Sequence, residues 1–135
     1  MSAEIVNVAD GTVTVRFSGR LTEPELTALH QNVGAILDKS RSVRILAIAE
    51  GFQGWERDGA WGDISFQVKY DRQIECKAIV CEERWENLAL LFASRGFRRF
   101  PIEYFPLADL ERARAWLAAV PPVQKHEDPR NAHAP

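Results

Sequence analysis

Hydrophobic and polar residues alternate at the start of the chain in the pattern of a β-hairpin. The runs Ile5–Ala9 and Thr12–Phe17 are rich in β-branched residues, and Asp10 with Gly11 between them is a preferred pair for a two-residue turn. In the second run every other residue is apolar, which predicts a strand with one buried face and one wetter face.

The next pattern is that of an amphipathic helix with a well-marked start. Thr22 is a suitable N-cap, Glu25 lies three residues on, as in a capping box, and Pro24 falls in the first turn, where proline is tolerated. Apolar residues then recur at helical spacing from Leu26 to Leu37. His30 lies one step beside this stripe, so we expect an ordinary histidine on the helix surface.

Three apolar runs further along the chain predict buried strands. Val43–Ala49 is nearly continuous and too short for a typical helix, so we interpret it as a central strand that ends at Glu50. Ile79–Cys81, preceded by further apolar residues from Ile74, and Ile102–Phe105 are the other two runs.

Helical spacing returns between and after these strands. The stretches from Trp85 to Phe92 and from Leu110 to Val120 carry apolar residues at intervals of three and four. The resulting order is hairpin, helix, strand, crossover segment, strand, helix, strand, helix. This alternation predicts an α/β domain with a mostly parallel five-stranded sheet, an N-terminal β-hairpin and four helices.

The segment from Glu50 to Tyr70 is ambiguous. It holds four of the chain's eight glycines and two of its four tryptophans. Its residues alternate from Ile64 to Tyr70 as in a strand. However, the segment has to join the two parallel strands on either side of it, and such a crossover takes about a dozen residues or more, which favours a helix. We therefore predict a helix from about Asp58 to Tyr70.

The composition is that of one soluble globular domain. The chain has 135 residues, of which 46% are hydrophobic and 27% charged, and its net charge of −2 gives no general attraction to nucleic acid or anionic membranes. We expect one domain over residues 1–120 and a disordered tail over residues 121–135, which is rich in proline and polar residues. The pattern contains no signal peptide and no run long enough to span a membrane.

The two cysteines indicate a reducing compartment. Cys76 and Cys81 lie five residues apart in one predicted strand, so they face opposite sides and cannot bridge each other. We expect buried thiols in a cytoplasmic protein. His126 and His133 lie in the predicted disordered tail, which makes a poor metal cage, so neither a metal site nor a cofactor is expected.

Aromatic residues, with particular glycine, acidic or aliphatic residues beside them, recur at specific places along the chain. They are Gly54 and Trp55, Trp61 with Asp63 and Phe66, Trp85 and Glu86, Tyr104 and Phe105, and Ala115 to Leu117. This set resembles the SpoIIAA-like family of small bacterial proteins, which belongs with the STAS and CRAL-TRIO folds, and the resemblance covers about residues 4–118. Most of these are packing residues, so they identify a fold better than a function.

The resemblance implies a non-enzymatic protein with an apolar pocket, covered by a mobile helix, that holds a lipid-like ligand or touches a membrane. The strands ending at Ala49 and Cys81 would deliver aromatic side chains to one edge of the sheet, where ligands of open α/β sheets commonly bind. The candidate pocket and lid residues are Phe52, Trp55, Trp61, Ile64, Phe66 and Trp85. In the alternative interpretation these side chains simply fill the core.

A basic and aromatic cluster follows the third predicted helix. Its members Arg95, Phe97, Arg98, Arg99 and Phe100 suit a membrane interface or an anionic head group. Alternatively, the phenylalanines dock on the core and the arginines pair with nearby acids. The partners expected are therefore a lipid or other apolar small molecule, the inner face of the membrane, or a protein, and no nucleic acid; the oligomeric state stays open, a dimer included.

Two further functions compete with ligand binding. STAS regulators imply a protein-binding module, but their switch serine at the start of the helix after the third strand has no counterpart in residues 50–55, so binding would not depend on phosphorylation. An enzyme would draw on acids near the strand ends, namely Glu50, Glu82 and Glu83, with Asp58 and Asp63 nearby. No histidine, cysteine or lysine falls at a matching position and no catalytic motif is present, so we predict no enzyme.

Overall fold

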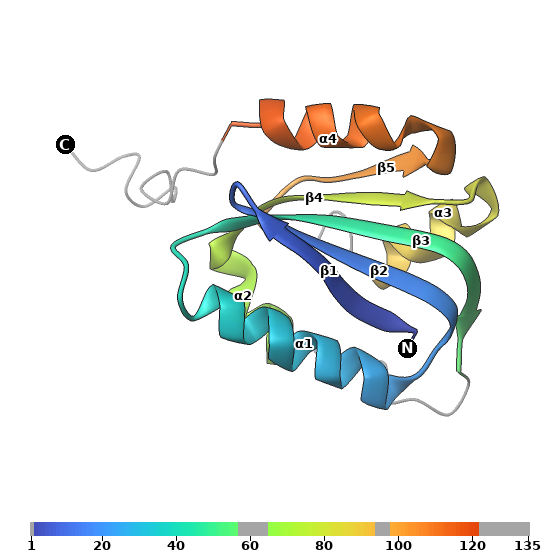
Figure 1. Ribbon diagram of the computed structural model, residues 1–135, viewed down its shortest axis with the longest axis horizontal. Helices are drawn as coiled ribbons and strands as arrows, with labels where there is room; N and C mark the ends of the chain where they lie inside the picture. The colour runs from blue at the N-terminus through green and yellow to red at the C-terminus, as the bar shows by residue number, and fades with distance from the viewer. Residues whose placement is uncertain (1, 57–64, 94–97, 122–135) are drawn as a thin grey trace.

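The computed structural model describes residues 2–56, 65–93 and 98–121, which form an α/β protein around a five-stranded sheet (Figure 1). The strands are β1 (Ala3–Ala9), β2 (Thr12–Leu21), β3 (Val43–Trp55), β4 (Ile74–Cys81) and β5 (Ile102–Pro106). The helices are α1 (Glu23–Leu37), α2 (Ser65–Tyr70), α3 (Glu86–Phe92) and α4 (Leu110–Ala119). The predicted order of elements is confirmed, whereas the predicted disordered tail lies outside the described residues.

The order of strands in the sheet follows their order in the chain, β1-β2-β3-β4-β5. The β1–β2 hairpin is antiparallel, and the other three neighbouring pairs are parallel, which confirms the predicted mixed sheet. Crossovers between parallel strands are right-handed, and here each one advances by a single strand in the same direction. The helices α1, α2 and α3 must therefore lie on one face of the sheet, and α4 covers the other (Figure 1).

Each face of the sheet buries its own hydrophobic core. The larger core, under α1, α2 and α3, contains Ile45 and Ile79, and the smaller core, under α4, contains Leu46. Cys81 belongs to the larger core and Cys76 to the smaller one, and both are free thiols. The two cysteines thus face opposite sides of the sheet, as their spacing predicted.

Strand β3 is longer than the sequence pattern indicated. It continues beyond Ala49 to Trp55, so the predicted end at Glu50 is wrong. Gly51 and Gly54 have φ angles of +68° and +98°, and the pairing with β2 shifts register in this part of the strand. Glycine here allows a bulged strand to go on instead of ending it. The aromatic residues at the end of β3 are consequently held by the sheet rather than by a loop.

Helix α1 begins at the predicted cap. The Thr22 hydroxyl oxygen accepts a hydrogen bond from the backbone N–H of Glu25 at 3.3 Å. The Glu25 carboxylate in turn accepts from the Thr22 hydroxyl at 2.9 Å and from the backbone N–H of Ser2 at 2.6 Å. The bonds from Ser2 are the main reason that the pKa of Glu25 is lowered, and they tie the start of the chain to the start of α1.

The segment before β4 is helical, as the need for a crossover predicted. Helix α2 is described over Ser65–Tyr70, and the predicted start near Asp58 lies outside the described residues. Phe66 and Tyr70 lie one turn apart with ring centroids 5.0 Å from each other, whereas Val68 between them is 74% exposed. A strand would place all three on one face, so the strand-like alternation does not reflect the local structure.

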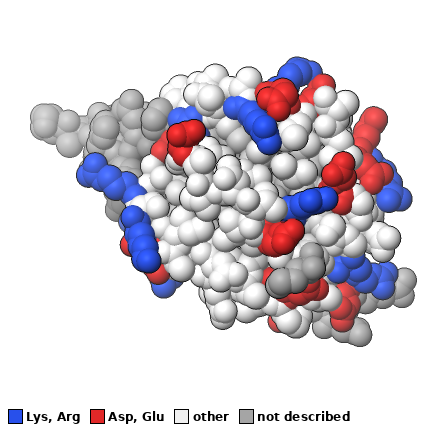
Figure 2. All heavy atoms as spheres, viewed as in Figure 1, with Lys and Arg blue, Asp and Glu red and all other residues white. Residues whose placement is uncertain are grey.

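Charged side chains of both signs are interspersed on the face shown in Figure 2, around a broad uncharged area. On α4, Arg112 pairs with Asp109 at 3.1 Å and Arg114 with Glu111 at 3.2 Å. Exposed pairs of this kind contribute little to stability. Within the described residues, no helix combines the length and apolar character needed to cross a membrane.

Candidate functional site

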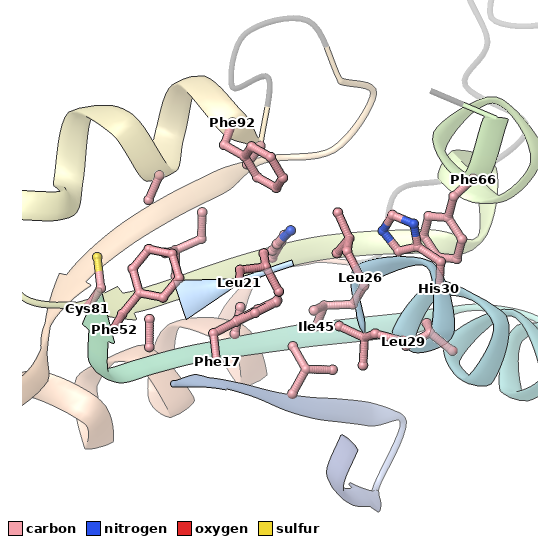
Figure 3. Close-up of a pocket in the computed structure, with 18 of the residues that line it drawn as sticks. Phe17, Leu21, Leu26, Leu29, His30, Ile45, Phe52, Phe66, Cys81 and Phe92 are labelled. Carbon is pink, nitrogen blue, oxygen red and sulfur yellow. The ribbon is translucent and has the colours of Figure 1, made fainter. Parts of the chain in front are cut away.

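A cavity of about 160 Å³ lies in the larger core, between the sheet and helices α1, α2 and α3 (Figure 3). Strands β2, β3 and β4 contribute the sheet side of its lining, and most of the lining side chains are aliphatic or aromatic. Figure 3 places Phe52 and Cys81 at one end of the cavity and His30 with Phe66 at the other. Among the described residues, the polar and charged side chains in the lining are His30, Gln67, Lys77 and Arg98.

Four rings form the wall at the Phe52 end, and we call them the aromatic cluster: Phe52, Trp55, Trp85 and Phe92. Phe52 meets Trp55 and Trp85 edge to face, with centroid distances of 5.0 and 5.2 Å. Trp55 lies 6.0 Å from Trp85 and 5.1 Å from Phe92. These separations fall in the favourable range for aromatic pairs. The cluster joins the end of β3 to the beginning and end of α3.

The close approach of β3 to the aromatic cluster depends on Gly54. Its φ of +98° is a conformation that other residues rarely adopt, and a Cβ atom there would stand 3.3 Å from the Trp85 ring. The indole N–H groups of Trp55 and Trp85 are buried and have no hydrogen-bond partner among the described residues. A buried donor without a partner costs roughly 1–3 kcal/mol, which is unusual for a wall that only fills a core.

The other end of the cavity is formed where α1 meets α2. His30 stacks on Phe66 with ring centroids 4.3 Å apart and an interplanar angle of 9°. His30 is half-buried and lines the cavity, so its predicted place as an ordinary surface histidine is wrong. Beside this pair, the Tyr70 hydroxyl donates to a carboxylate oxygen of Asp38 at 3.0 Å. Helix α2 is thereby fixed to α1 through two aromatic side chains.

Lys77 is a charged residue in the cavity lining that was not among the predicted site residues. It lies in the middle of β4, paired with Ile45 of β3 and Ile102 of β5, and its side chain lines the cavity. Burial is the main cause that lowers its pKa from 10.5 to about 8; the positive charge of Arg98 adds to the effect and Asp71 opposes it. At neutral pH the amine is therefore still mostly protonated.

Arg98 also reaches the cavity, but its charge is paired and three of its five N–H donors are engaged. Its guanidinium forms a two-bond pair with the Asp71 carboxylate, at 2.7 and 2.6 Å, and a third bond to the carbonyl of Ala93 at 2.9 Å. The Arg98 side chain is only 7% exposed, and its guanidinium lies over the Phe100 ring at 4.7 Å. The geometry is that of a structural ion pair linking the segment after α3 to the turn after α2.

The residues of the predicted basic and aromatic surface do not share one environment. Arg98 is paired and Phe100 is buried, so both follow the alternative interpretation and neither is free to meet a membrane. Arg99 is exposed. Arg95 and Phe97 lie outside the described residues.

Of the predicted pocket residues, Phe52, Trp55, Phe66 and Trp85 all line the cavity. Trp61 and Ile64 lie outside the described residues. Four of the six predicted residues thus lie in the wall of the cavity, whereas His30, Gln67 and Lys77 were not predicted to line it. For Lys77 a signal existed, because a lysine inside an apolar run of a central parallel strand faces a covered side of the sheet.

Of the acids weighed for catalysis, Glu50, Glu82 and Glu83 are not among the residues that line the cavity. Glu50 faces Arg16 at 3.7 Å and Glu82 faces Arg84 at 3.3 Å, while Asp58 and Asp63 are outside the described residues. Cys81 does line the cavity, but burial, followed by Glu86 and Glu82, raises its pKa to about 11, so it stays a neutral thiol. In the described part of the chain, no three His, Cys, Asp or Glu residues are grouped to hold a metal ion.

Most of this fold, from β2 nearly to the end of α4, matches a known family. A family model described as SpoIIAA-like matches residues 12–118. The chain belongs to the SpoIIAA-like family. Among solved structures, this SpoIIAA-like protein is similar to an uncharacterized protein of the DUF3478 family from Shewanella loihica PV-4 that has a SpoIIAA-like fold, with a TM-score of 0.64, 19% sequence identity, and coverage of 85% of this chain and 91% of that one. At this identity the likeness shows a shared fold alone.

No curated protein matches the sequence. The part of the SpoIIAA-like chain that the family model matches runs from the start of β2 nearly to the end of α4. All the strands and helices that line the cavity fall inside it. The described lining of the cavity therefore lies within the family domain, and none of its residues comes from β1.

Proposed function

We propose that this SpoIIAA-like protein binds a small apolar molecule in the cavity between the sheet and helices α1, α2 and α3, without chemically changing it. The observation that carries the proposal is the cavity itself, about 160 Å³ within the larger core. Protein interiors are close-packed and contain few voids larger than a water molecule, so a cavity of this size beside a core is unusual. A fold selected for stability alone would fill it.

The volume limits the ligand. A dry apolar cavity of roughly 150 Å³ accepts benzene, whereas pockets for drug-sized molecules measure about 300 Å³ or more. The 160 Å³ cavity therefore suits a molecule built on one ring or a short alkyl chain. A longer, lipid-like ligand would fit only if the helices over the cavity moved apart, which is the role expected of the predicted lid.

A cavity-filling variant tests the proposal. Toluene should raise the melting temperature of the wild type, because a ligand that binds only the folded state stabilises it. Ala89→Met places a larger side chain in the cavity lining and should remove this shift, whereas Ala118→Met, on the exposed side of α4, should keep it. The proposal is wrong if toluene stabilises both variants equally or leaves the wild type unchanged.

A second candidate function is contact with a membrane, and exposed apolar side chains favour it. Val68 on α2 and Leu91 on α3 are 74% and 75% exposed, and Leu88 is 49% exposed. Exposed apolar side chains of this size are typical of interaction surfaces, for a protein partner as well as for lipid. The double change Val68→Glu with Leu91→Glu should abolish cosedimentation with phospholipid vesicles, and a wild type that stays in the supernatant would exclude this function.

A further inference from the structure

The cavity holds a positive charge that no described residue neutralises. Lys77 lies on the cavity face of β4, four residues before Cys81 and beside Ile45. Its ammonium group forms no ion pair or hydrogen bond with any residue that the structure describes. The described lining contains no aspartate or glutamate.

The other cation in the lining is already satisfied. The guanidinium of Arg98 donates hydrogen bonds to the Asp71 carboxylate and to the carbonyl of Ala93. The negative charge of Asp71 is thus matched by an arginine rather than left to the lysine. The cavity as a whole carries a surplus of one positive charge among its described residues.

A structural role does not explain this lysine. Placing an unpaired charge among apolar side chains is unfavourable, and an apolar residue at position 77 would continue the pattern of the neighbouring buried residues Ile79 and Cys81. The flexible four-carbon stem of lysine presents a point charge to its surroundings. Such a group is well suited to meet an anion that enters the cavity.

We propose that the cavity selects a small apolar molecule that bears one carboxylate, and that the carboxylate pairs with the ammonium group of Lys77. This inference rests on the proposed function and adds the chemical class of the ligand. Lys77 and Cys81 are separated by roughly 13 Å along β4, at about 3.3 Å per residue. The apolar body of the ligand would then extend from Lys77 toward the aromatic cluster, where rings pack favourably.

The pairing also has a clear energetic reason. A carboxylate and an ammonium that meet inside a protein form a charge-assisted hydrogen bond, which is roughly twice as strong as a neutral one. Benzoate is the simplest probe of this class, because it combines one ring with one carboxylate. Toluene has nearly the same shape without the charge, so it serves as the matched probe for the cavity alone.

The test compares these two probes on the full chain and on Lys77→Met by calorimetric titration. We expect Lys77→Met to weaken benzoate binding at least tenfold and to change toluene binding less than twofold, while Lys77→Arg retains most of the benzoate affinity. If benzoate binds the wild type and Lys77→Met equally well, the carboxylate inference is overturned and the apolar site stands. If neither probe binds the wild type, the proposed function itself fails.

A measurement on the wild type avoids dependence on any variant. The chain has four lysines, so the ¹³Cε signals of labelled lysine can be resolved. Benzoate should shift the Lys77 signal and leave that of Lys39, which is outside the cavity lining, unchanged. Equal shifts at both lysines, or none at Lys77, would overturn the inference.

Discussion

At the scale of single residues, Lys77 lies in an environment that is unfavourable for a charged side chain. Its half-buried side chain lines a mostly apolar cavity, and burial, with help from Arg98, lowers its pKa to about 8. Asp71 raises the pKa in part, and His30 of α1 lines the same cavity. The folded protein therefore holds the Lys77 proton less tightly than the unfolded chain does.

This difference predicts how stability depends on pH. Between about pH 8 and 10.5 the unfolded chain keeps the Lys77 proton while the folded protein releases it, so the free energy of unfolding contributed by this residue rises with pH. The rise is on the order of 3 kcal/mol at most. Lys77→Met should lack it and should be more stable than the wild type at pH 7, as judged by urea unfolding of both proteins at several pH values. Parallel stability curves for the two proteins would contradict the prediction.

At the scale of elements, the contact between α1 and α2 closes one end of the cavity and depends on Gly34. A Cβ atom on Gly34 would stand 2.9 Å from the Tyr70 hydroxyl oxygen, so the tyrosine can lie against α1 only because glycine is there. In the interior of a helix, glycine is otherwise less favourable than alanine by about 1 kcal/mol. Helix α1 is therefore intrinsically less stable at this position than it would be with alanine, but the glycine leaves space for Tyr70.

Whether a substitution at Gly34 stabilises or destabilises the protein tests this contact. Gly34→Ala should destabilise the wild type, because it displaces Tyr70 and disturbs the bond to Asp38. In a Tyr70→Leu background, the same change should stabilise the protein by about 0.5–1 kcal/mol, the intrinsic helix preference. Urea unfolding of the four proteins gives the coupling energy. A stabilising effect of Gly34→Ala in both backgrounds would show that the contact does not constrain α1.

Element boundaries differed from the sequence prediction where glycine was involved. Asp10 and Gly11 form the predicted turn, but Gly51 lies inside β3 rather than at its end. A sequence shows that a glycine is present without showing whether its positive φ ends a strand or bends it. By contrast, α2 was correctly predicted to be helical because the connection between two parallel strands constrains the segment more strongly than its local alternation does.

At the scale of the whole molecule, the cavity follows from the connectivity. A sheet whose strands are ordered as in the chain, joined by crossovers of one hand, places three helices on one face and leaves the other to α4. The sequence pattern was sufficient for this architecture because the alternation of strands and helices is encoded locally. The aromatic wall was predictable in part as well, since Phe52 comes three residues after the apolar run that ends at Ala49, and Trp85 four residues after Cys81.

The polar part of the site was not predictable in the same way. The pairing of Arg98 with Asp71 joins residues 27 positions apart, and the stacking of His30 on Phe66 joins two helices. Such contacts depend on tertiary packing, which a single sequence does not reveal. Lys77 was identifiable from its place in a doubly covered strand, because the apolar pattern of that strand reaches back to Ile74 in the sequence.

The central claim, that the cavity is a ligand site, is tested most directly by NMR of the tryptophan indole groups during a toluene titration. Trp55 and Trp85 line the cavity, whereas Trp116 packs near Phe105 on the opposite face of the sheet and serves as an internal control. We predict that toluene shifts the indole N–H signals of Trp55 and Trp85 in a saturable way and leaves that of Trp116 in place. Unchanged signals from Trp55 and Trp85, or an equal shift at Trp116, would contradict the claim.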